Sequence, residues 1–302
     1  SDLGFLALCI AISIATPSFL GKQNILNLLR QSSIIGIISA GMTFVIISGN
    51  FDISVGAVAA LAGAITMKFA TGGTNLFASM FLGVAICAVI GLINGIVVAK
   101  INVPSLIATM AMVTIVRGLL LMLTGGYPIT ENIPILDYIG NGYLFNIPIP
   151  VVIFFIVVLA SFIVLNKTKF GRYVYSVGGN QEASKLNGIN VDSHKVKVFI
   201  INAVLAGIAG IVLTGRLGTA TAIAGEGYDM DAIASVVIGG TSVAGGSGSV
   251  LKTVIGVLLM SVINNSFNLL GIDVYFQYIF KGLIILAAVG FDSYSKKKLA
   301  SR

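Results

Sequence analysis

Long apolar stretches separated by short polar breaks follow one another along the chain, and they predict a bundle of membrane-spanning helices. A spanning helix requires about 20 mostly apolar residues. The third and eighth stretches are short for a full crossing, so we expect them to be bent or partly buried in protein. The pattern predicts an all-α, polytopic integral membrane protein with about ten transmembrane helices, forming one transmembrane domain over residues 1–302. The ten segments are Leu3–Ala15, Ser32–Ser48, Ser54–Phe69, Leu76–Ala99, Val103–Leu123, Pro148–Leu165, Val196–Gly215, Asp231–Val243, Thr253–Leu270 and Tyr275–Phe291.

The composition excludes a soluble domain of this length. Hydrophobic residues make up 57% of the 302 residues and charged residues 10%, whereas soluble domains carry roughly 25% charged residues. The two cysteines, Cys9 and Cys87, both lie in apolar segments, which excludes a disulfide framework and a zinc site. The first segment is too short for a full span, so we expect further residues upstream of Ser1.

The basic residues indicate the orientation of the helices. An even number of spans puts both termini on one side, and positively charged loops are retained in the cytosol. With cytosolic termini, the loop of about residues 167–195 faces the cytosol, and the loop of about residues 125–147 forms a structured external cap rather than a helix. This orientation explains the net charge of +7 without nucleic acid as a partner. Twelve of the 18 basic residues then lie on the cytosolic side, namely Lys100, Lys167, Lys169, Arg172, Lys185, Lys195, Lys197, Lys252, Lys296, Lys297, Lys298 and Arg302.

The sequence contains no residue pattern typical of an enzyme. The single histidine, His194, has no nucleophile–base set around it. The segment Gly245–Thr253 departs from a phosphate-binding loop at Leu251, because glycine precedes the lysine in that motif. We therefore expect no catalytic residues, no metal ligands, no cofactor and no nucleotide hydrolysis by this chain. Nor does an acid lie at the centre of a predicted span, so the energy for uphill transport is expected to come from a partner. The acids at segment ends are Asp52, Glu226, Asp229, Asp231 and Asp273.

A short helix is predicted within the cytosolic loop. Asn180 is a favourable N-cap, Glu182 lies in the first turn where the helix dipole favours an anion, and Gly188 is a favourable stop. The spacing leaves two interpretations open: a rigid knob that a soluble partner grips, or an ordinary positively charged loop. The candidate coupling residues are Gly178, Gly179, Asn180, Gln181, Glu182, Ala183, Ser184 and Lys185.

A polar break between the second and third segments is one candidate for a translocation path. Asn50, Phe51 and Asp52 form this break. They either line a passage or leave Asp52 to cap the following helix.

Polar residues inside apolar segments form further candidates. Asn264 and Asn268 share a helix face, and with Asn265 they either hydrogen-bond a hydroxylated solute or hold helices together. Arg117 and Lys281 lie within predicted spans, where a charge either serves function or extends to the nearer interface.

Several stretches spread along the chain form recognisable motifs: residues 41–46, 51–56, 171–175, 178–180, 186–191, 227–234 and 239–246. Together they resemble the membrane permeases of bacterial ABC importers for ribose and related monosaccharides. The resemblance extends from about Thr16 to Asp292. Two departures stand out: Asn50 lies where the family commonly has glycine, and Ser247 and Ser249 replace basic residues.

This resemblance implies a ten-helix subunit of the type II importer kind in the bacterial plasma (inner) membrane. Two copies would pair as a homodimer around a shared sugar path. An extracytoplasmic sugar-binding protein would dock outside, and a cytosolic ATPase with two nucleotide-binding halves would dock inside. Gly178–Lys185 would be the coupling helix, and ribose is the expected sugar, with another pentose, a hexose or a furanose signal left open. A partner-independent carrier or channel is the alternative, and a membrane-embedded enzyme is a third possibility.

Overall fold

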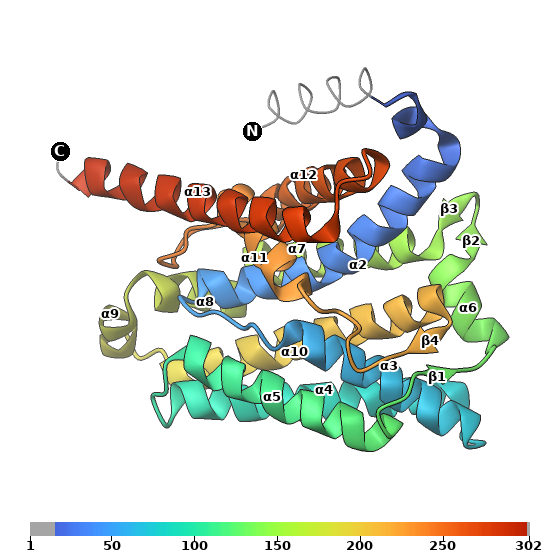
Figure 1. Ribbon diagram of the computed structural model, residues 1–302. Coiled ribbons are helices and arrows are strands. Elements are labelled where there is room, and N and C mark those ends of the chain that lie inside the picture. The colour runs from blue at the N-terminus through green and yellow to red at the C-terminus, as the bar shows by residue number, and fades with distance from the viewer. Residues whose placement is uncertain (1–15, 301–302) are drawn as a thin grey trace.

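Helices dominate the computed structural model, which describes residues 16–300 (Figure 1). The first predicted segment, Leu3–Ala15, lies outside the described residues together with Cys9. The elements in chain order are η1 (Pro17–Leu20), α2 (Lys22–Ile47), α3 (Val55–Thr71), α4 (Leu76–Ala99), α5 (Ser105–Thr124), β1 (Ile129–Thr130), α6 (Pro134–Asn141), β2 (Tyr143–Leu144), β3 (Ile147–Pro148), α7 (Ile149–Lys167), α8 (Lys169–Gly179), α9 (Gln181–Leu186), α10 (Val191–Leu217), β4 (Thr219–Ala220), α11 (Tyr228–Ile238), α12 (Val250–Leu269) and α13 (Val274–Ala300).

Six of the described helices are long and apolar enough to cross a membrane: α2, α4, α5, α7, α10 and α12. The expectation of about ten full spans is not confirmed. The predicted third and eighth segments become α3 and α11, which are shorter and mostly buried in the bundle, as expected for segments too short to cross alone. The fold is therefore all-α and rich in potential spans, with two short helices enclosed by longer ones.

Helix α2 begins at Lys22 instead of at the predicted Ser32. The intervening residues are too polar to be counted in an apolar segment, but they find partners elsewhere in the bundle. Asn24 exchanges two side-chain hydrogen bonds with Asn265 of α12, at 2.9 and 2.8 Å. Arg30 donates through Nη2 to the Asn141 carbonyl at 3.1 Å. These long-range contacts stabilise a helical extension that the hydropathy pattern does not reveal.

Helix α10 lies at the centre and packs against α2, α3 and α4. Its contact with α4 is close because glycines on α4 face its backbone. A Cβ added to Gly91 would lie 2.6 Å from the Phe199 carbonyl oxygen, and one added to Gly95 would lie 2.7 Å from the Val196 Cα. Small residues at such positions let helix backbones approach one another.

Two interrupted segments meet inside the bundle. The chain leaves α2 at Ile47, turns and re-enters before α3, and it likewise leaves α10 at Leu217 and re-enters before α11. The two re-entrant stretches touch at Gly56 and Gly225, where a Cβ on either glycine would overlap the backbone of the other. Helix α3 therefore starts within the protein, where non-helical backbone is tolerated because other segments surround it. Helix α11 starts beside an open cleft, where Ile223 is 72% exposed.

One end of the bundle is covered by the loop between α5 and α7, and we call it the α6 end. β1 pairs antiparallel with β4, β2 pairs with β3, and helix α6 lies between them. The prediction that the loop of residues 125–147 forms a cap without a helix is wrong, because this loop contains α6. Pro134 occupies the first turn of α6 and Asp137 also lies in that turn, both favourable positions at a helix start. The opposite end, which we call the α9 end, carries α8 and α9 (Figure 1).

Candidate functional site

Helix α9 projects from the α9 end and matches the predicted short helix. Asn180 is its N-cap, and its Oδ1 accepts a hydrogen bond from the Ala183 amide at 2.9 Å. Glu182 lies in the first turn and Lys185 in the last. Gly188 follows with φ of +77°, a conformation that glycine adopts without strain. The local capping signals of the sequence thus predict this helix correctly.

Side chains attach α9 to its neighbours. The Ser184 hydroxyl is buried and lies 2.9 Å from that of Ser176 in α8. Lys195 Nζ donates to Gln181 Oε1 at 2.9 Å, which joins α9 to the start of α10. The opposite surface of α9 is open, with the Leu186 side chain 89% exposed. This helix is therefore fixed on one face and free to contact a partner on the other.

The C-terminal part of α8, which leads into α9, packs against the backbone of two distant segments. A Cβ on Gly178 would overlap the Ile47 carbonyl at the end of α2. That same carbonyl accepts a hydrogen bond from the Gly246 amide at 2.8 Å. Tyr175 donates its hydroxyl proton to the Gly248 carbonyl at 3.0 Å, and burial raises the pKa of this phenol, which keeps it protonated as a donor. Displacement of α9 would thus be transmitted to α2 and to the loop before α12.

Asp52 lies in the break between α2 and α3 and is 1% exposed. Its Oδ1 accepts from the Ser54 amide at 2.9 Å and from the Ser54 hydroxyl at 2.6 Å. Its Oδ2 accepts from Asn202 Nδ2 at 2.9 Å, in the interior of α10. Asn94 of α4 completes the cluster by donating to Ser54 Oγ at 3.1 Å. Asp52 therefore fixes the turn before α3, whose N-cap is Ser54 without a side-chain cap bond, and it crosslinks the bundle.

Asp52 lies between α2 and α3, at a segment end as expected. The chain then re-enters the bundle and brings the Asp52 carboxylate against the interior of α10. Hydroxyls of α5 satisfy the re-entrant backbone, because Ser105 accepts from the Phe51 amide at 3.1 Å and Thr109 from the Ile53 amide at 3.3 Å. Asn50 donates only locally, to the Ser48 carbonyl and hydroxyl at 3.1 Å.

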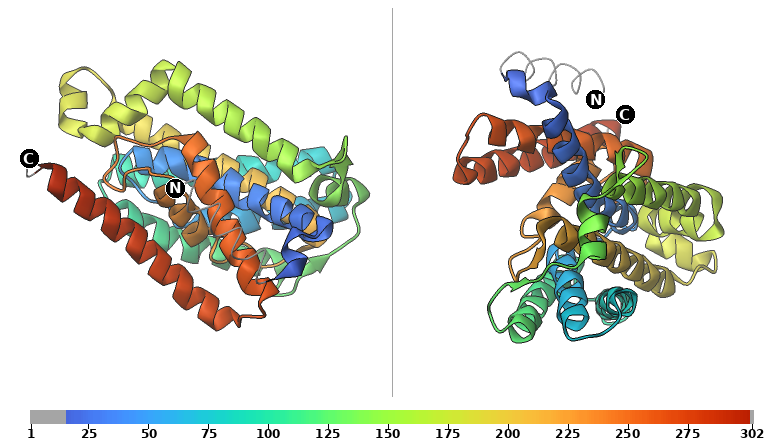
Figure 2. Two further views of the ribbon diagram at one scale, coloured as in Figure 1. Left: turned by 90° about the horizontal axis from the view of Figure 1, so that it is seen from above. Right: turned by 90° about the vertical axis from the view of Figure 1, so that its right-hand side faces the viewer.

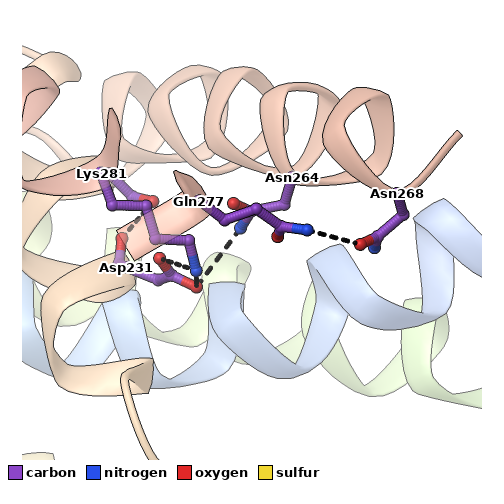
Figure 3. Close-up of polar contacts among 6 residues, drawn as sticks. Asp231, Asn264, Asn268, Gln277 and Lys281 are labelled. Atoms are coloured by element: carbon purple, nitrogen blue, oxygen red, sulfur yellow. Dashed lines mark hydrogen bonds and ion pairs between the residues drawn. The ribbon is translucent and has the colours of Figure 1, made fainter. Parts of the chain in front are cut away.

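The three candidate asparagines of α12 have different partners. Asn264 is buried and donates to Asp231 Oδ2 at 3.3 Å (Figure 3). Asn268 accepts from Gln277 Nε2 of α13 at 3.2 Å (Figure 3). Asn265 faces away, toward Asn24 at the start of α2. Each side chain thus joins helices, the second of the two roles that the sequence left open.

Lys281 turns inward from α13 instead of extending to an interface. Its Nζ lies 3.0 Å from Asp231 Oδ1 and 3.1 Å from Oδ2, with side chains 21% and 5% exposed (Figure 3). Asn264 donates to the same carboxylate, so α11, α12 and α13 meet at Asp231.

Near the meeting point of the re-entrant stretches, an open cleft of about 700 Å³ runs beside α5. Arg117 lies in the interior of α5 and donates through Nη1 to the carbonyls of Ala222 and Ala224, the latter at 3.2 Å. Glu226 and Asp229 are the nearby opposite charges. The cleft is lined by Ile53, Gly56, Ala57, Met110, Val113, Thr114, Arg117, Ala222, Ile223, Gly225, Glu226, Gly227, Asp229, Met230 and Tyr278.

None of the six candidate path residues lines this cleft. Asn50, Phe51, Asp52, Asn264, Asn265 and Asn268 are all placed elsewhere. Glu226 and Asp229 are not among the residues predicted from the sequence to form the path, although Asp229 lies in the matching stretch 227–234. A signal was nevertheless present, because Gly225 and Gly227 flank Glu226 and mark a backbone break next to charged residues.

Comparison with known proteins decides the family. A family model described as "Branched-chain amino acid transport system / permease component" matches residues 24–289. The chain belongs to this permease family. It is accordingly an all-α, multi-pass membrane protein.

Curated relatives cover nearly the full chain. The ribose import permease protein RbsC of Haemophilus influenzae is 44% identical, over 98% of this chain and 94% of its own length. That of Bacillus subtilis is 44% identical over 96% and 91%. The L-arabinose transport system permease protein AraH of Escherichia coli is 35% identical over 97% and 89%. No solved structure matches the chain significantly.

Proposed function

We propose that this chain is the membrane permease subunit of an ABC importer that carries a monosaccharide, with ribose as the first candidate. The family description names branched-chain amino acids. The full-length relatives instead are named for sugars: ribose at 44% identity, and xylose and L-arabinose at 35%. This gradient favours ribose over the other two pentoses and favours a sugar over an amino acid.

A separate cytosolic ATPase with two nucleotide-binding halves would supply the energy, and this chain would not be an enzyme. Helix α9 would be the coupling element at the cytosolic end of a plasma (inner) membrane protein with both termini in the cytosol. The candidate residues Gly178 and Gly179 lie at the end of α8, which leads directly into α9. The close packing of Gly178 against the end of α2 supports this role. The ATPase must bind the outward and inward states with different affinity, since otherwise it cannot shift their equilibrium. An extracytoplasmic sugar-binding protein would deliver the solute at the α6 end.

The cleft beside Arg117 is the observation that carries the transport proposal. Arg117, Glu226 and Asp229 would face hydrocarbon if this side of the subunit met lipid. Charged residues within a membrane almost always face a bundle interior or a water-filled cavity. A second copy of the chain closing this side would enclose the cleft on a shared axis. The resulting polar passage would be the sugar path.

The lining suits a polyhydroxylated solute. Carboxylates of Glu226 and Asp229 accept hydrogen bonds from sugar hydroxyls, and Arg117 and Thr114 donate them. Tyr278 adds an aromatic surface with a polar tip. The volume of about 700 Å³ lies within the range of about 300–1,000 Å³ that is usual for small-molecule sites.

Reconstituted vesicles test the proposed function. The chain is inserted with its ATPase and binding protein, and labelled ribose, xylose, L-arabinose and leucine are compared. Ribose accumulation that requires internal ATP supports the proposal. Sugar flux by the chain alone would favour the partner-independent carrier or channel. Uptake of leucine instead of sugar would show that the transported solute is an amino acid.

Cysteine accessibility tests the path independently of transport. In a variant with Cys9 and Cys87 replaced by alanine, Ile223→Cys places a thiol in the cleft, and Phe155→Cys places one on α7. The native side chains are 72% and 67% exposed. A hydrophilic thiol reagent is expected to modify position 223 and not position 155. Equal protection of both would show that the cleft is filled by lipid.

A further inference from the structure

A second cleft, of about 460 Å³, opens where α4 ends and α10 begins. Viewed from the α6 end, α4 lies on the opposite side of the bundle from α13, whose Tyr278 helps line the first cleft (Figure 2, right). A second copy that closes the first cleft would leave this one facing lipid. It is lined by Leu92, Ile96, Lys100, Asn190, Asp192, Ser193, Val196, Lys197 and Ile200.

The two ends of this cleft differ in chemistry. Lys100 lies at the α9 end and Lys197 lies nearly two turns into α10, and both are exposed. Asn190 and Ser193 lie at the start of α10, and Asp192 is the single acid of the lining. Apart from Lys197, the part of the cleft that lies deeper along the helices is apolar. Residues 92 to 100 span about 12 Å of α4, at about 1.5 Å per residue. The apolar part is lined by Leu92, Ile96, Val196 and Ile200.

The walls of the cleft are held in place. Gly91 and Gly95 bring α4 against the backbone of α10, so the two helices cannot close further. At the mouth, Asn190 Oδ1 accepts from the Ser193 amide at 3.0 Å and fixes the start of α10. The groove is therefore a permanent feature of the packed helices and does not depend on flexible loops.

We propose that this cleft binds one anionic phospholipid of the cytosolic leaflet. Its phosphate would lie between Lys100 and Lys197, and an acyl chain would follow the apolar residues toward the middle of the bilayer. Basic pockets between helices on the cytosolic side bind anionic headgroups. The proposal uses the orientation given above, in which the α9 end is cytosolic. A free anion does not account for the apolar lining, whereas a phospholipid accounts for it, and the long Lys197 side chain can extend its ammonium along the helix toward the headgroup.

The site lies next to the coupling element. Lys195, one turn from the cleft residue Asp192, donates to Gln181 of α9. A bound lipid would stabilise the first turns of α10 and, through this contact, the position of α9. Sugar uptake is thus expected to depend on anionic lipid, although the lipid is not transported.

Lipid binding by the purified subunit tests the proposal. It is placed in nanodiscs of phosphatidylcholine with increasing phosphatidylglycerol of the same acyl chains, and retained lipid is measured by native mass spectrometry. The Lys100→Gln/Lys197→Gln variant is expected to bind phosphatidylglycerol more weakly, by about fivefold for each lysine removed. The control variant Lys167→Gln/Lys169→Gln removes the same charge at the same end, outside the cleft, and is expected to bind like the wild type.

Three results would overturn the proposal. Equal loss of binding in the two variants would mean general attraction to a positive surface, and no loss in either would exclude the cleft. Equal stabilisation by inorganic phosphate alone, seen as the same rise in Tm, would identify a free-anion site. Both variants replace exposed side chains, and their Tm in pure phosphatidylcholine verifies that they fold. Failure of ribose uptake would leave these measurements unaffected, so the two proposals can fail separately.

Discussion

Lys281 of α13 and Asp231 of α11 form an ion pair, with Nζ 3.0 Å from Oδ1 and both side chains largely withdrawn from the surface. The two residues are 50 positions apart in the chain. Asp231 follows directly after Met230, and Lys281 lies three residues after Tyr278, and both of these neighbours line the large cleft. The pair therefore holds the α13 wall of the cleft against α11.

Lys281→Met is expected to destabilise the protein, because it leaves the Asp231 carboxylate buried without its cation. Breaking a buried pair from one side costs about 3–5 kcal/mol, and partial exposure of Lys281 puts this case at the lower end. The decrease would be measured as a lower Tm in detergent micelles.

The double variant Asp231→Asn/Lys281→Met separates charge from packing. Removal of both charges leaves no isolated ion, so Tm is expected to recover most of the loss. If the double variant were as unstable as Lys281→Met, the defect would lie in the packing of α13 and not in the uncompensated carboxylate.

Gly178→Ala is expected to disrupt the packing of the end of α8 against α2, whereas Gly179→Ala is expected to be tolerated. A Cβ at position 178 would overlap the Ile47 carbonyl, but one at position 179 would approach only to 3.9 Å from the Gly246 Cα. Overpacking costs about 1–3 kcal/mol, and rigid backbone on both sides favours the upper value. Membrane yield and ATP-dependent uptake would be compared, and equal behaviour of the two variants would contradict the contact.

Features of the fold that depend on residues close together in the sequence are predicted well from the sequence. The apolar segment Leu76–Ala99 coincides with α4. The capping residues Asn180 and Gly188 delimit α9 correctly. Both depend on interactions within a few residues, which composition and spacing express directly.

Contacts between residues that are far apart in the sequence cannot be predicted in the same way. Hydropathy places Lys281 in a predicted apolar segment, but only the fold shows that Asp231 faces it. Asp52 follows a helix end in the sequence, yet the re-entrant chain brings it to Asn202, 150 positions away. The cleft depends on the meeting of Gly56 and Gly225, which no local pattern contains.

Asp52→Ala is expected to be more harmful than Asn50→Gly. Loss of the Asp52 carboxylate leaves the buried Asn202 amide and the Ser54 groups without their acceptor, at about 1–3 kcal/mol for each unpaired group. Asn50→Gly removes donors together with their bonds, and Asn50 is not among the non-glycine residues with positive φ, so its backbone does not require glycine. Thermal unfolding of both variants would check the order, and a greater loss for Asn50→Gly would contradict the crosslinking role of Asp52.

Glu182→Lys is expected to impair coupling without impairing membrane insertion. The substitution places a cation in the first turn of α9, where the helix dipole favours an anion. The direct cost to the helix is only about 0.3–1 kcal/mol, so the folded subunit persists. The altered charge would lie on the surface proposed to meet the ATPase, and ATP-dependent ribose uptake should fall more than the amount of inserted protein. Glu131→Lys makes the same charge change near the α6 end and serves as the control for membrane insertion. Unchanged uptake by Glu182→Lys would remove α9 from the coupling path.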